Sequence, residues 1–312
     1  MLRFLTRRLG AALITAWIAA SVAFVMLRLL PGDALAARLA QGGATAAQIA
    51  ERREALGLDQ PVAMQYISLI GGLLRLDLGR SLITGRPVSE MIGEQLQPTL
   101  TLAAGGAGVG LALGLVLGIA AGAGRGRVVR GGALLTATLL LSSPIYWTGT
   151  LLIYVVSVQM RLLPSTGSSD DVRFLILPWL ALGLALAGSV ARLTAASLEA
   201  YRDADFIRTA RAKGLPERRV LWRHMLRPGL GPVIALVGVQ TGFLLGGAVV
   251  TEMIFVRPGL GQVLLAAVND RDFPVVQGLV ILSAILYSVV GAAADLIAAL
   301  LDPRIRAEPD AV

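Results

Sequence analysis

Six stretches of this chain contain no charged side chain, and each is long enough to cross a lipid bilayer as a helix. They cover residues 9–27, 95–124, 131–160, 174–191, 228–251 and 273–294. A helix needs roughly 18 to 20 apolar residues to span a hydrocarbon core of about 30 Å. With 55% hydrophobic and 15% charged residues among 312, the chain is too apolar for a soluble domain. The pattern predicts an all-α polytopic membrane protein with six transmembrane helices.

Three further apolar features bear on this count. The run Pro61–Leu74 is too short to span and is expected at the membrane interface or inside a folded loop. The first stretch lacks a small-residue cleavage site, so it is expected to remain as a helix and not to be removed as a signal peptide. Pro144 and Pro178 are expected to kink a helix or to begin one.

Positively charged residues near the ends of the stretches predict the orientation. Arg residues cluster at the N-terminus, at 125–130, in 199–227 and in the C-terminal tail, and six crossings place these clusters on one face. By the positive-inside rule this face is cytoplasmic, so both termini are expected there. The net charge of +8 follows from this topology, which argues against a nucleic-acid partner and leaves the lipid bilayer as the surroundings.

The same pattern divides the chain into four parts. They are an N-terminal cytoplasmic segment with the first helix at 1–30, an exported loop at 31–97, a helical core at 98–301 and a cytoplasmic tail at 302–312. The exported loop mixes both signs of charge and is long enough to fold.

One charged segment, residues 199–227, interrupts the apolar pattern between the fourth and fifth stretches. It holds the only Lys and the only His of the chain. A hydrophobic chain that gathers charge in one loop presents that loop to a partner in water. Gly214 is expected to end a first short helix in a left-handed cap, Pro216 to begin a second helix, and Pro228 to stop it.

Glycine recurs at every fourth position in the second stretch and again in the fifth. The glycines expected to pack against other helices are Gly106, Gly110, Gly114, Gly118, Gly122, Gly238, Gly242 and Gly246. This spacing clears a groove in which another backbone can approach closely. Static packing is the simpler interpretation, and a sliding surface between moving helices is the alternative.

Ionisable residues inside the stretches are nearly absent. Arg28 and Glu252 fall near the ends, where they are expected to reach the interface. Asp295 lies within the last helix, where a structural anchor is favoured over a proton or ion site. A proton-driven carrier would hold more carboxylates or His at this depth, so an ATP-independent secondary carrier or channel is the weaker alternative.

The sequence contains no motif for chemistry of its own. No Gly-rich phosphate loop leads into Lys213, the chain has no Cys, and its single His224 falls in the charged segment. We therefore expect no enzyme activity, no metal site and no bound cofactor. What remains is a passage-forming subunit or scaffold powered from elsewhere, with a non-transporting anchor or sensor as a further alternative.

The charged segment resembles the coupling motif of binding-protein-dependent ABC transporter permeases, specifically the B-type subunit of the dipeptide, oligopeptide and nickel branch. The matching residues there are Glu199, Ala200, the run 205–215, Val220, Arg223, His224 and Pro232. Further blocks match the branch in order along the chain, at residues 27–33, 56–61, 77–81, 246–252, 258–261 and 301–306.

The resemblance implies the type I ABC importer permease fold in the plasma (inner) membrane of a bacterium. It also implies partners, namely a C-type permease subunit in a heterodimer, one or two cytosolic ABC ATPase subunits and an extracytoplasmic solute-binding protein. ATP and Mg²⁺ would be bound by the ATPase subunits and not by this chain. Di- or oligopeptides are the expected solutes, with nickel, glutathione or a sugar as alternatives within the branch.

By the same resemblance, coupling helices within 197–228 dock onto the ATPase. The residues assigned to this contact are Glu199, Ala200, Asp205, Arg208, Ala210, Arg211, Ala212, Lys213, Gly214 and Leu215. Small side chains, at Ala204, Ala210 and Ala212, let a helix lie close to a partner. Arg208 and Arg211 offer charged contacts at the rim of such an interface.

Overall fold

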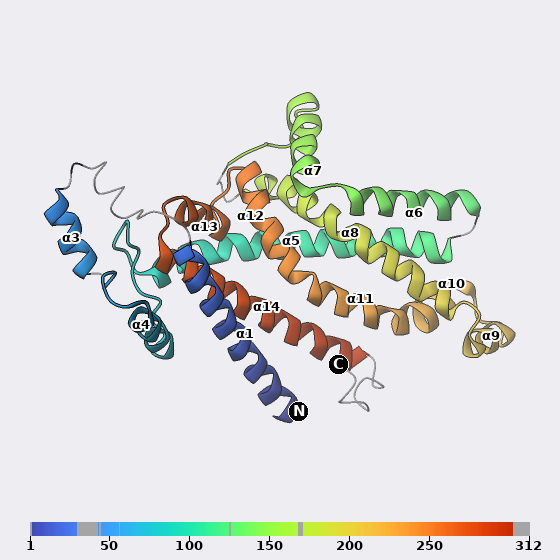
Figure 1. Cartoon of the computed structure of the whole chain (residues 1–312). Helices are drawn as coiled ribbons and strands as arrows, with labels where there is room; N and C mark the ends of the chain where they lie inside the picture. Colours follow the sequence, from blue (N-terminus) through green and yellow to red (C-terminus); the bar gives the residue numbers. More distant parts are fainter. Residues whose placement is uncertain are drawn as a thin grey trace. The chain divides into compact units, whose positions relative to one another are not determined.

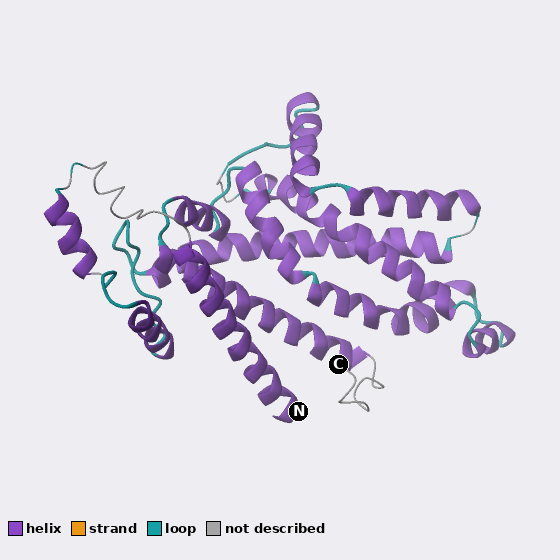
Figure 2. Ribbon diagram, in the orientation of Figure 1, coloured by secondary structure: helices purple, strands orange, loops and turns teal. Residues whose placement is uncertain are grey.

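Helices form most of the part of this protein that the structure describes. The computed structural model describes residues 2–29, 43, 45–55, 57–124, 126–167 and 171–301 (Figure 1). In these ranges the only β pairing is an isolated bridge between Arg80 and Pro87, and the remaining non-helical residues form turns and loops (Figure 2). The all-α prediction is confirmed. The predicted tail at 302–312 and residues 30–42 of the predicted exported loop lie outside the described residues.

The helices range from a single turn to ten turns. Their bounds are α1 Leu2–Leu29, α3 Ala46–Ala55, α4 Val62–Leu74, α5 Val88–Ala123, α6 Arg127–Ser142, α7 Ile145–Leu152, η1 Ile153–Gln159, α8 Arg173–Tyr201, α9 Asp205–Ala212, α10 Glu217–Arg219, η2 Val220–Leu226, α11 Arg227–Val239, α12 Thr241–Ile254, α13 Leu260–Asn269 and α14 Phe273–Leu301. The segments η1 and η2 are π-helices, which continue α7 and α10 without a break in the chain.

Four helices are long and apolar enough to cross a membrane singly. They cover residues 10–29, 88–123, 173–201 and 273–294. Two bent pairs, 127–142 with 145–159 and 217–239 with 242–254, raise the number to six if each pair makes one crossing. This agrees with the six predicted stretches. The helix α4, at 13 residues, is too short to cross, as predicted for this run.

The third predicted stretch, 131–160, is not one straight helix. Its two halves meet at an angle of 106°. Ser143 and Pro144 have extended backbones there, with ψ angles of 120° and 142°. Proline cannot donate a helical hydrogen bond, and it disfavours the helical conformation of the residue before it. Pro144 therefore begins α7, as expected, whereas Pro178 lies inside α8 without ending it.

One compact unit consists of residues 1–98 and 259–288. Its core joins the end of α1 with the start of α5, α13 and the first half of α14. The buried side chains of this core are Leu27, Val88, Ile92, Leu260, Ala267, Val275, Val276 and Leu279. The short helix α4 packs on α1, because the rings of Tyr66 and Phe24 lie 5.2 Å apart edge to face and the Tyr66 hydroxyl lies 2.7 Å from that of Ser21.

A buried carboxylate fastens the loop before α5 within this unit. Asp272, between α13 and α14, accepts hydrogen bonds from the hydroxyl of Ser81 and, at 3.0 Å, from the backbone N–H of Leu82. Asp272 and Ser81 are 4% and 1% exposed. A buried charge is tolerated when charge-assisted hydrogen bonds satisfy it, so Asp272 holds the loop to the helical core.

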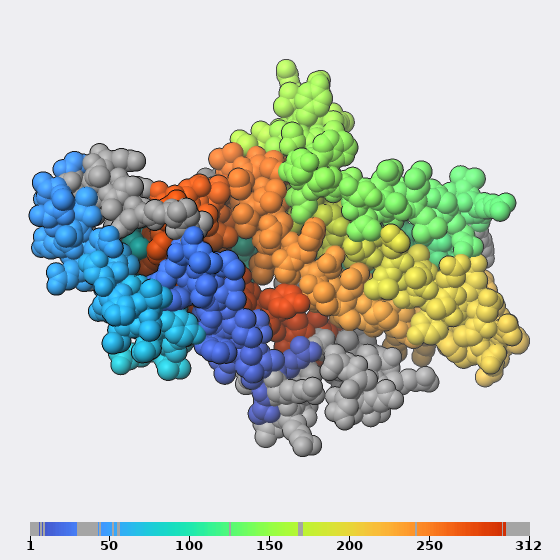
Figure 3. Space-filling view, in the orientation of Figure 1, coloured from blue at the N-terminus to red at the C-terminus, as the bar shows by residue number. Residues whose placement is uncertain are grey.

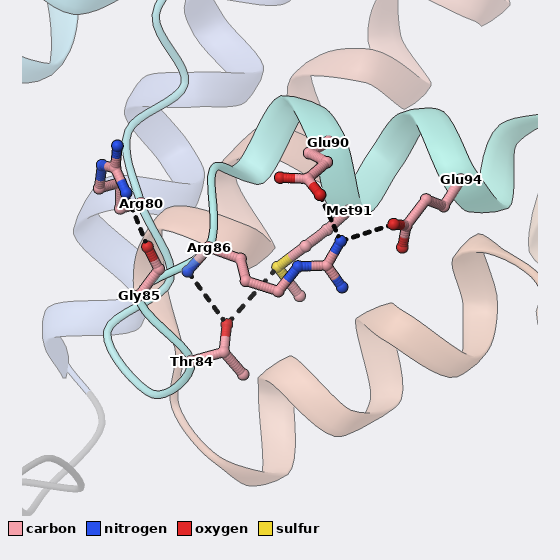
Figure 4. A network of polar contacts seen from close by, with 7 residues as sticks. All are labelled: Arg80, Thr84, Gly85, Arg86, Glu90, Met91 and Glu94. Carbon is pink, nitrogen blue, oxygen red and sulfur yellow. Dashed lines mark hydrogen bonds and ion pairs between the residues drawn. The ribbon is translucent and has the colours of Figure 1, made fainter.

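An exposed charge cluster links the same loop to the first turns of α5 (Figure 4). The Arg86 guanidinium donates to Glu90 at 2.8 Å and to Glu94 at 2.5 Å, both on the first turns of α5. Arg80 donates to the Gly85 carbonyl at 3.0 Å across the turn. The hydrogen bond that Arg86 donates to Glu94, then the one that it donates to Glu90, raises the pKa of Arg86 above its ordinary value. The cluster joins the loop to the N-terminal end of α5, where carboxylates are also favoured by the helix dipole.

The second unit consists of residues 99–258 and 289–312, and the parallel pair α5 and α8 lies at its centre. Gly106 faces Leu182, Gly114 faces Val190 and Gly122 faces Leu198, so the two helices stay in register. A Cβ atom added at Gly114 would lie 2.5 Å from Val190 Cβ and 2.9 Å from the carbonyl oxygen of Ala187. The backbones therefore touch along about 24 Å of helix, at 1.5 Å of rise per residue.

Glu252 is enclosed in this second unit. It is 1% exposed and accepts a 2.6 Å hydrogen bond from the hydroxyl of Thr99, which is itself 4% exposed. The prediction that Glu252 reaches the interface is therefore wrong. Its charge also acts on Arg257, just beyond α12, where burial lowers the pKa and Glu252 partly opposes that shift. Asp295 lies in α14, but its side chain is outside the described residues.

Large apolar side chains lie exposed along many of the helices. On α1 they are Leu13, Ile14, Trp17 and Ile18, and on α7 and η1 they are Tyr146, Trp147, Leu151 and Tyr154. In a water-soluble protein of this size such surfaces would be buried. Lipid tails solvate them instead, which is consistent with the membrane assignment.

Candidate functional site

The charged segment of the sequence forms a compact projection between α8 and α11. It contains α9, α10 and η2 and is drawn in yellow at the right-hand edge of Figure 3. We call residues 199–227 the coupling segment. The chain leaves α8 at Tyr201, turns through Arg202 and Asp203, and enters α9 from an extended Ala204.

Gly214 ends α9 in the left-handed conformation, with φ of 73°. The N–H of Gly214 donates to the carbonyl of Arg211 at 2.9 Å, and the N–H of Leu215 donates to that of Ala210 at 3.3 Å. These two bonds make the Schellman cap, and Leu215 completes it by packing on the cluster that contains Ala210. The predicted left-handed cap is confirmed. No atom lies within 4 Å of a Cβ built at Gly214, so only the backbone requires glycine there.

The second half of the segment differs from the prediction at its end. Pro216 directly precedes α10, as expected of a residue that begins a helix. Pro228 does not stop a helix, however, because it occupies the first turn of α11, which follows η2 without a gap. Proline has no N–H to donate to the preceding turn, and the wider π-helical turns of η2 lie directly before it.

The inner face of α9 is buried against the rest of the second unit. Ile207 is fully buried and Ala210 is 5% exposed. They pack with Leu198 at the end of α8 and with Val220, Met225 and Leu226 of the second half of the segment; Ile119 and Ala123 at the end of α5 border this cluster. The assigned residue Ala210 thus contacts the chain's own core. Its small side chain serves the internal packing of α9.

The outer face of α9 is exposed. The exposed side chains are Asp205, Phe206, Arg208, Thr209, Arg211, Ala212 and Lys213. Arg208 lies 3.9 Å from Asp205 in an ion pair whose side chains are 68% and 100% exposed. Such an exposed pair contributes little to stability, so both charges stay available to a partner. Phe206, 47% exposed, is a large apolar side chain among these charges.

Arg211 is engaged within the segment. Its Nε donates to Glu217 at 2.8 Å, and another guanidinium nitrogen donates to the carbonyl of Arg202 at 3.3 Å. The side chain therefore ties α9 to both α10 and the end of α8. Arg208 and Arg211 are the two arginines expected at the rim of the interface with the ATPase, and Arg208 is the more exposed of the two.

Two other arginines anchor the segment to the C-terminal end of α5. Arg202 donates to the carbonyl of Gly122 at 2.6 Å, and Arg130 donates to that of Ala121 at 3.2 Å. Arg130 also pairs with the assigned residue Glu199 at 3.1 Å, while Ala200 beside it is exposed. Cations at the end of a helix satisfy free carbonyls and oppose the negative end of its dipole.

Sequence reasoning missed Phe206, Arg202 and Arg130 as members of this site. Phe206 could have been found as an apolar side chain inside a charged run. Arg130 could not, because its contact with Glu199 joins residues 69 positions apart. Phe206 is also held from behind, since its ring lies 6.0 Å from that of Tyr201 edge to face.

The predicted packing glycines of the fifth stretch lie in different surroundings. A Cβ at Gly238 would lie 2.4 Å from that of Ala294 in α14, so this glycine permits close approach. Gly242 and Gly246 are exposed, and no atom lies within 4 Å of a Cβ built at Gly246.

In the described ranges no three His, Cys, Asp or Glu side chains are grouped so as to hold a metal ion.

Comparisons with known proteins cover almost the whole chain. Residues 114–307 match a family described as "Binding-protein-dependent transport system inner membrane component", and residues 1–103 match "Binding-prot-dependent transport system membrane comp, N-term". The glutathione transport system permease proteins GsiC of Escherichia coli O6:H1 and Salmonella choleraesuis are 38% and 39% identical over 307 residues, covering 98% of this chain and 99% of each relative.

A solved structure shares the fold. An inward-facing conformation of the MetNI methionine ABC transporter matches with a TM-score of 0.59 and 17% identity, covering 68% of this chain and 96% of that one. At this identity the match bears on the fold alone. It agrees with the type I importer fold expected from the sequence.

Proposed function

Because this chain belongs to the family of binding-protein-dependent transport system inner membrane components, in its peptide and nickel branch, we propose that α9 is the element through which it is driven. The chain is a permease subunit of an ABC importer. In the proposal α9 docks onto a cytosolic ATPase subunit, which binds and hydrolyses ATP with Mg²⁺. Movement of α9 then switches the side of the membrane to which the translocation path is open.

What supports the proposal is the division of α9 into two faces. Ile207 and Ala210 fix the inner face in the core, and Phe206, Arg208 and Lys213 leave an apolar and cationic outer face in water. An exposed aromatic residue flanked by charges is typical of a protein interface. The cap at Gly214 and the Arg211–Glu217 pair hold this face in one shape.

For the solute we propose glutathione or a short peptide of similar size. The relatives with 38–39% identity over nearly the entire chain are named glutathione permeases. An extracytoplasmic binding protein would deliver the solute, and a C-type permease subunit would form the other half of the path. Both termini would lie in the cytoplasm of a bacterium.

The docking proposal is tested by reversing the outer face of α9. In the complete importer reconstituted in proteoliposomes, the double variant Phe206→Ala, Arg208→Glu is expected to reduce solute-stimulated ATP hydrolysis and uptake by at least about tenfold, which corresponds to about 1.4 kcal/mol of docking free energy. Arg127→Glu, also an exposed arginine on the predicted cytoplasmic face, is the matched control and should leave both rates unchanged.

A direct contact is tested by cross-linking. Since the chain has no Cys, Ala212→Cys introduces a single thiol on the exposed side of α9. It is expected to cross-link to a Cys in the ATPase cleft, and the yield should change with nucleotide. Wild-type ATP hydrolysis in the double variant, together with no cross-link in any nucleotide state, would remove α9 from the coupling path.

A further inference from the structure

A surface concavity of about 460 Å³ lies in the second half of the coupling segment. It is lined by Pro216, Arg218, Arg219, Trp222 and Arg223, from α10, η2 and the residue before them. These residues do not belong to the outer face of α9. We call this concavity the arginine pocket.

No described acidic side chain pairs with the three arginines of the pocket. Within the described residues, none of the Arg218, Arg219 and Arg223 guanidinium groups makes a hydrogen bond or an ion pair. The nearest acidic residue in sequence, Glu217, is already held by Arg211 at 2.8 Å. Three free guanidinium groups around one concavity form a site for an anion, and the planar fork of arginine suits phosphate oxygens in particular.

Trp222 supplies the apolar wall of the pocket. Its side chain is 57% exposed although it is the largest apolar group in the segment. It lies on the helical run 217–239, which together with 242–254 is long and apolar enough to form one bent membrane span. Tryptophan is enriched where a span meets the head groups of the bilayer, because its ring is apolar and its N–H is polar.

We propose that the arginine pocket binds the phosphate head group of an anionic phospholipid. The arginines would pair with the phosphate, and the Trp222 ring would lie at the boundary between the head group and the acyl chains. A free phosphate ion would satisfy the arginines but would leave Trp222 unexplained. The position of the pocket at the start of a span, with a tryptophan in its wall, therefore favours a lipid. The proposal does not depend on α9 docking to an ATPase.

The test measures lipid selectivity directly. The full-length chain, purified with the subunits that accompany it, is incubated with phosphatidylglycerol or phosphatidylcholine, and retained lipid is counted by native mass spectrometry. Phosphatidylglycerol is expected to be retained about tenfold more. The triple variant Arg218→Gln, Arg219→Gln, Arg223→Gln should lose this preference. The triple variant Arg127→Gln, Arg161→Gln, Arg173→Gln removes the same charge from exposed sites elsewhere and should keep it.

A second measurement locates the lipid. Brominated phosphatidylglycerol quenches nearby tryptophan, and the difference between wild type and Trp222→Phe isolates the Trp222 signal. Stronger quenching by brominated phosphatidylglycerol than by brominated phosphatidylcholine supports the proposal. Equal lipid retention by both triple variants would overturn it. Displacement of the lipid by millimolar inorganic phosphate would also overturn it and would assign the pocket to a soluble anion. Loss of Trp222 quenching whenever the ATPase subunit is bound would overturn it too and would assign the pocket to the protein partner.

Discussion

Gly214 shows how a single backbone conformation sets the shape of the coupling segment. Its φ of 73° belongs to the left-handed region, which costs other residues roughly 1–2 kcal/mol. Gly214→Ala is therefore expected to weaken the cap and to speed hydrogen exchange at the amides of Gly214 and Leu215 by about 5- to 30-fold. Gly131→Ala, an exposed glycine in α6 with nothing within 4 Å, should leave exchange in the coupling segment unchanged.

Hydrogen exchange measured on the complete importer decides this prediction. Unchanged exchange at both amides in Gly214→Ala would mean that the cap does not limit the opening of α9. A uniform increase along the chain would instead indicate global destabilisation, which a Cβ atom in open space does not predict.

Asp272 is the residue whose loss should most affect the loop before α5. Asp272→Ala removes the acceptor of Ser81 and Leu82 from a buried site, and is expected to lower the unfolding free energy by about 2–3 kcal/mol. Asp59→Ala breaks only the exposed pair with Arg53 and should cost under about 1 kcal/mol. Thermal unfolding in detergent compares the two, and equal midpoints would show that Asp272 does not hold the loop.

Single residues were predictable from sequence where their effect is local. Gly214 acts through its own backbone, so the cap could be predicted from the charged run and the glycine after it. Glu252 could not be placed, because the hydroxyl that it contacts belongs to Thr99, 153 residues away. Pro228 was placed wrongly because the π-helix η2 continues directly into α11. Tertiary contacts and unusual helical turns leave no periodic signal in the sequence.

At the scale of helices, the glycine ladder of α5 predicts opposite effects for two similar substitutions. Gly114→Ala places a Cβ 2.5 Å from Val190 and 2.9 Å from the Ala187 carbonyl oxygen, so α5 and α8 must separate, at an expected cost of about 1–3 kcal/mol. Gly108→Ala, in the same helix with nothing within 4 Å, should be neutral or stabilise by up to about 1 kcal/mol through helix propensity.

Unfolding of the purified importer measures this pair of variants. The prediction fails if both alanines have the same effect, because the substitution is chemically identical and only the neighbouring helix differs. Uptake with Gly114→Ala also bears on the alternative of sliding helices. If the Gly114→Ala importer has wild-type stability and wild-type uptake, the contact between α5 and α8 tolerates displacement, which would favour the sliding surface.

The helices themselves were predictable because membrane spans are recognised in a sequence by their length and their lack of charged residues. The break at Ser143–Pro144 was expected as a kink, but its 106° angle was not, since proline alone does not fix a direction. The close packing of α5 on α8 was suggested by the glycine spacing. Which helix fills the groove depends on the fold, and the sequence could not identify α8 as the partner.

For the whole molecule, the orientation of the six crossings is a separate prediction. The chain has no Cys, so Lys213→Cys and Thr166→Cys each provide one exposed thiol, in the coupling segment and between η1 and α8. In intact spheroplasts, an impermeant maleimide is expected to label Thr166→Cys, and to label Lys213→Cys only after permeabilisation. The reverse labelling pattern would mean that the orientation is opposite to the predicted one, and that the coupling segment lies on the side of the membrane away from a cytosolic ATPase.

The rigid contact between α5 and α8 has a mechanical consequence. If the close glycine contacts hold the two helices in register, α5 and α8 would move as one body, and a displacement at one end would reach the other. The projection that carries α9 packs on the C-terminal ends of both helices, through Leu198 of α8 and through Ile119 and Ala123 of α5. If α9 is driven as proposed, a small displacement there would tilt both helices together, so the part of the path that opens could lie far from the ATPase.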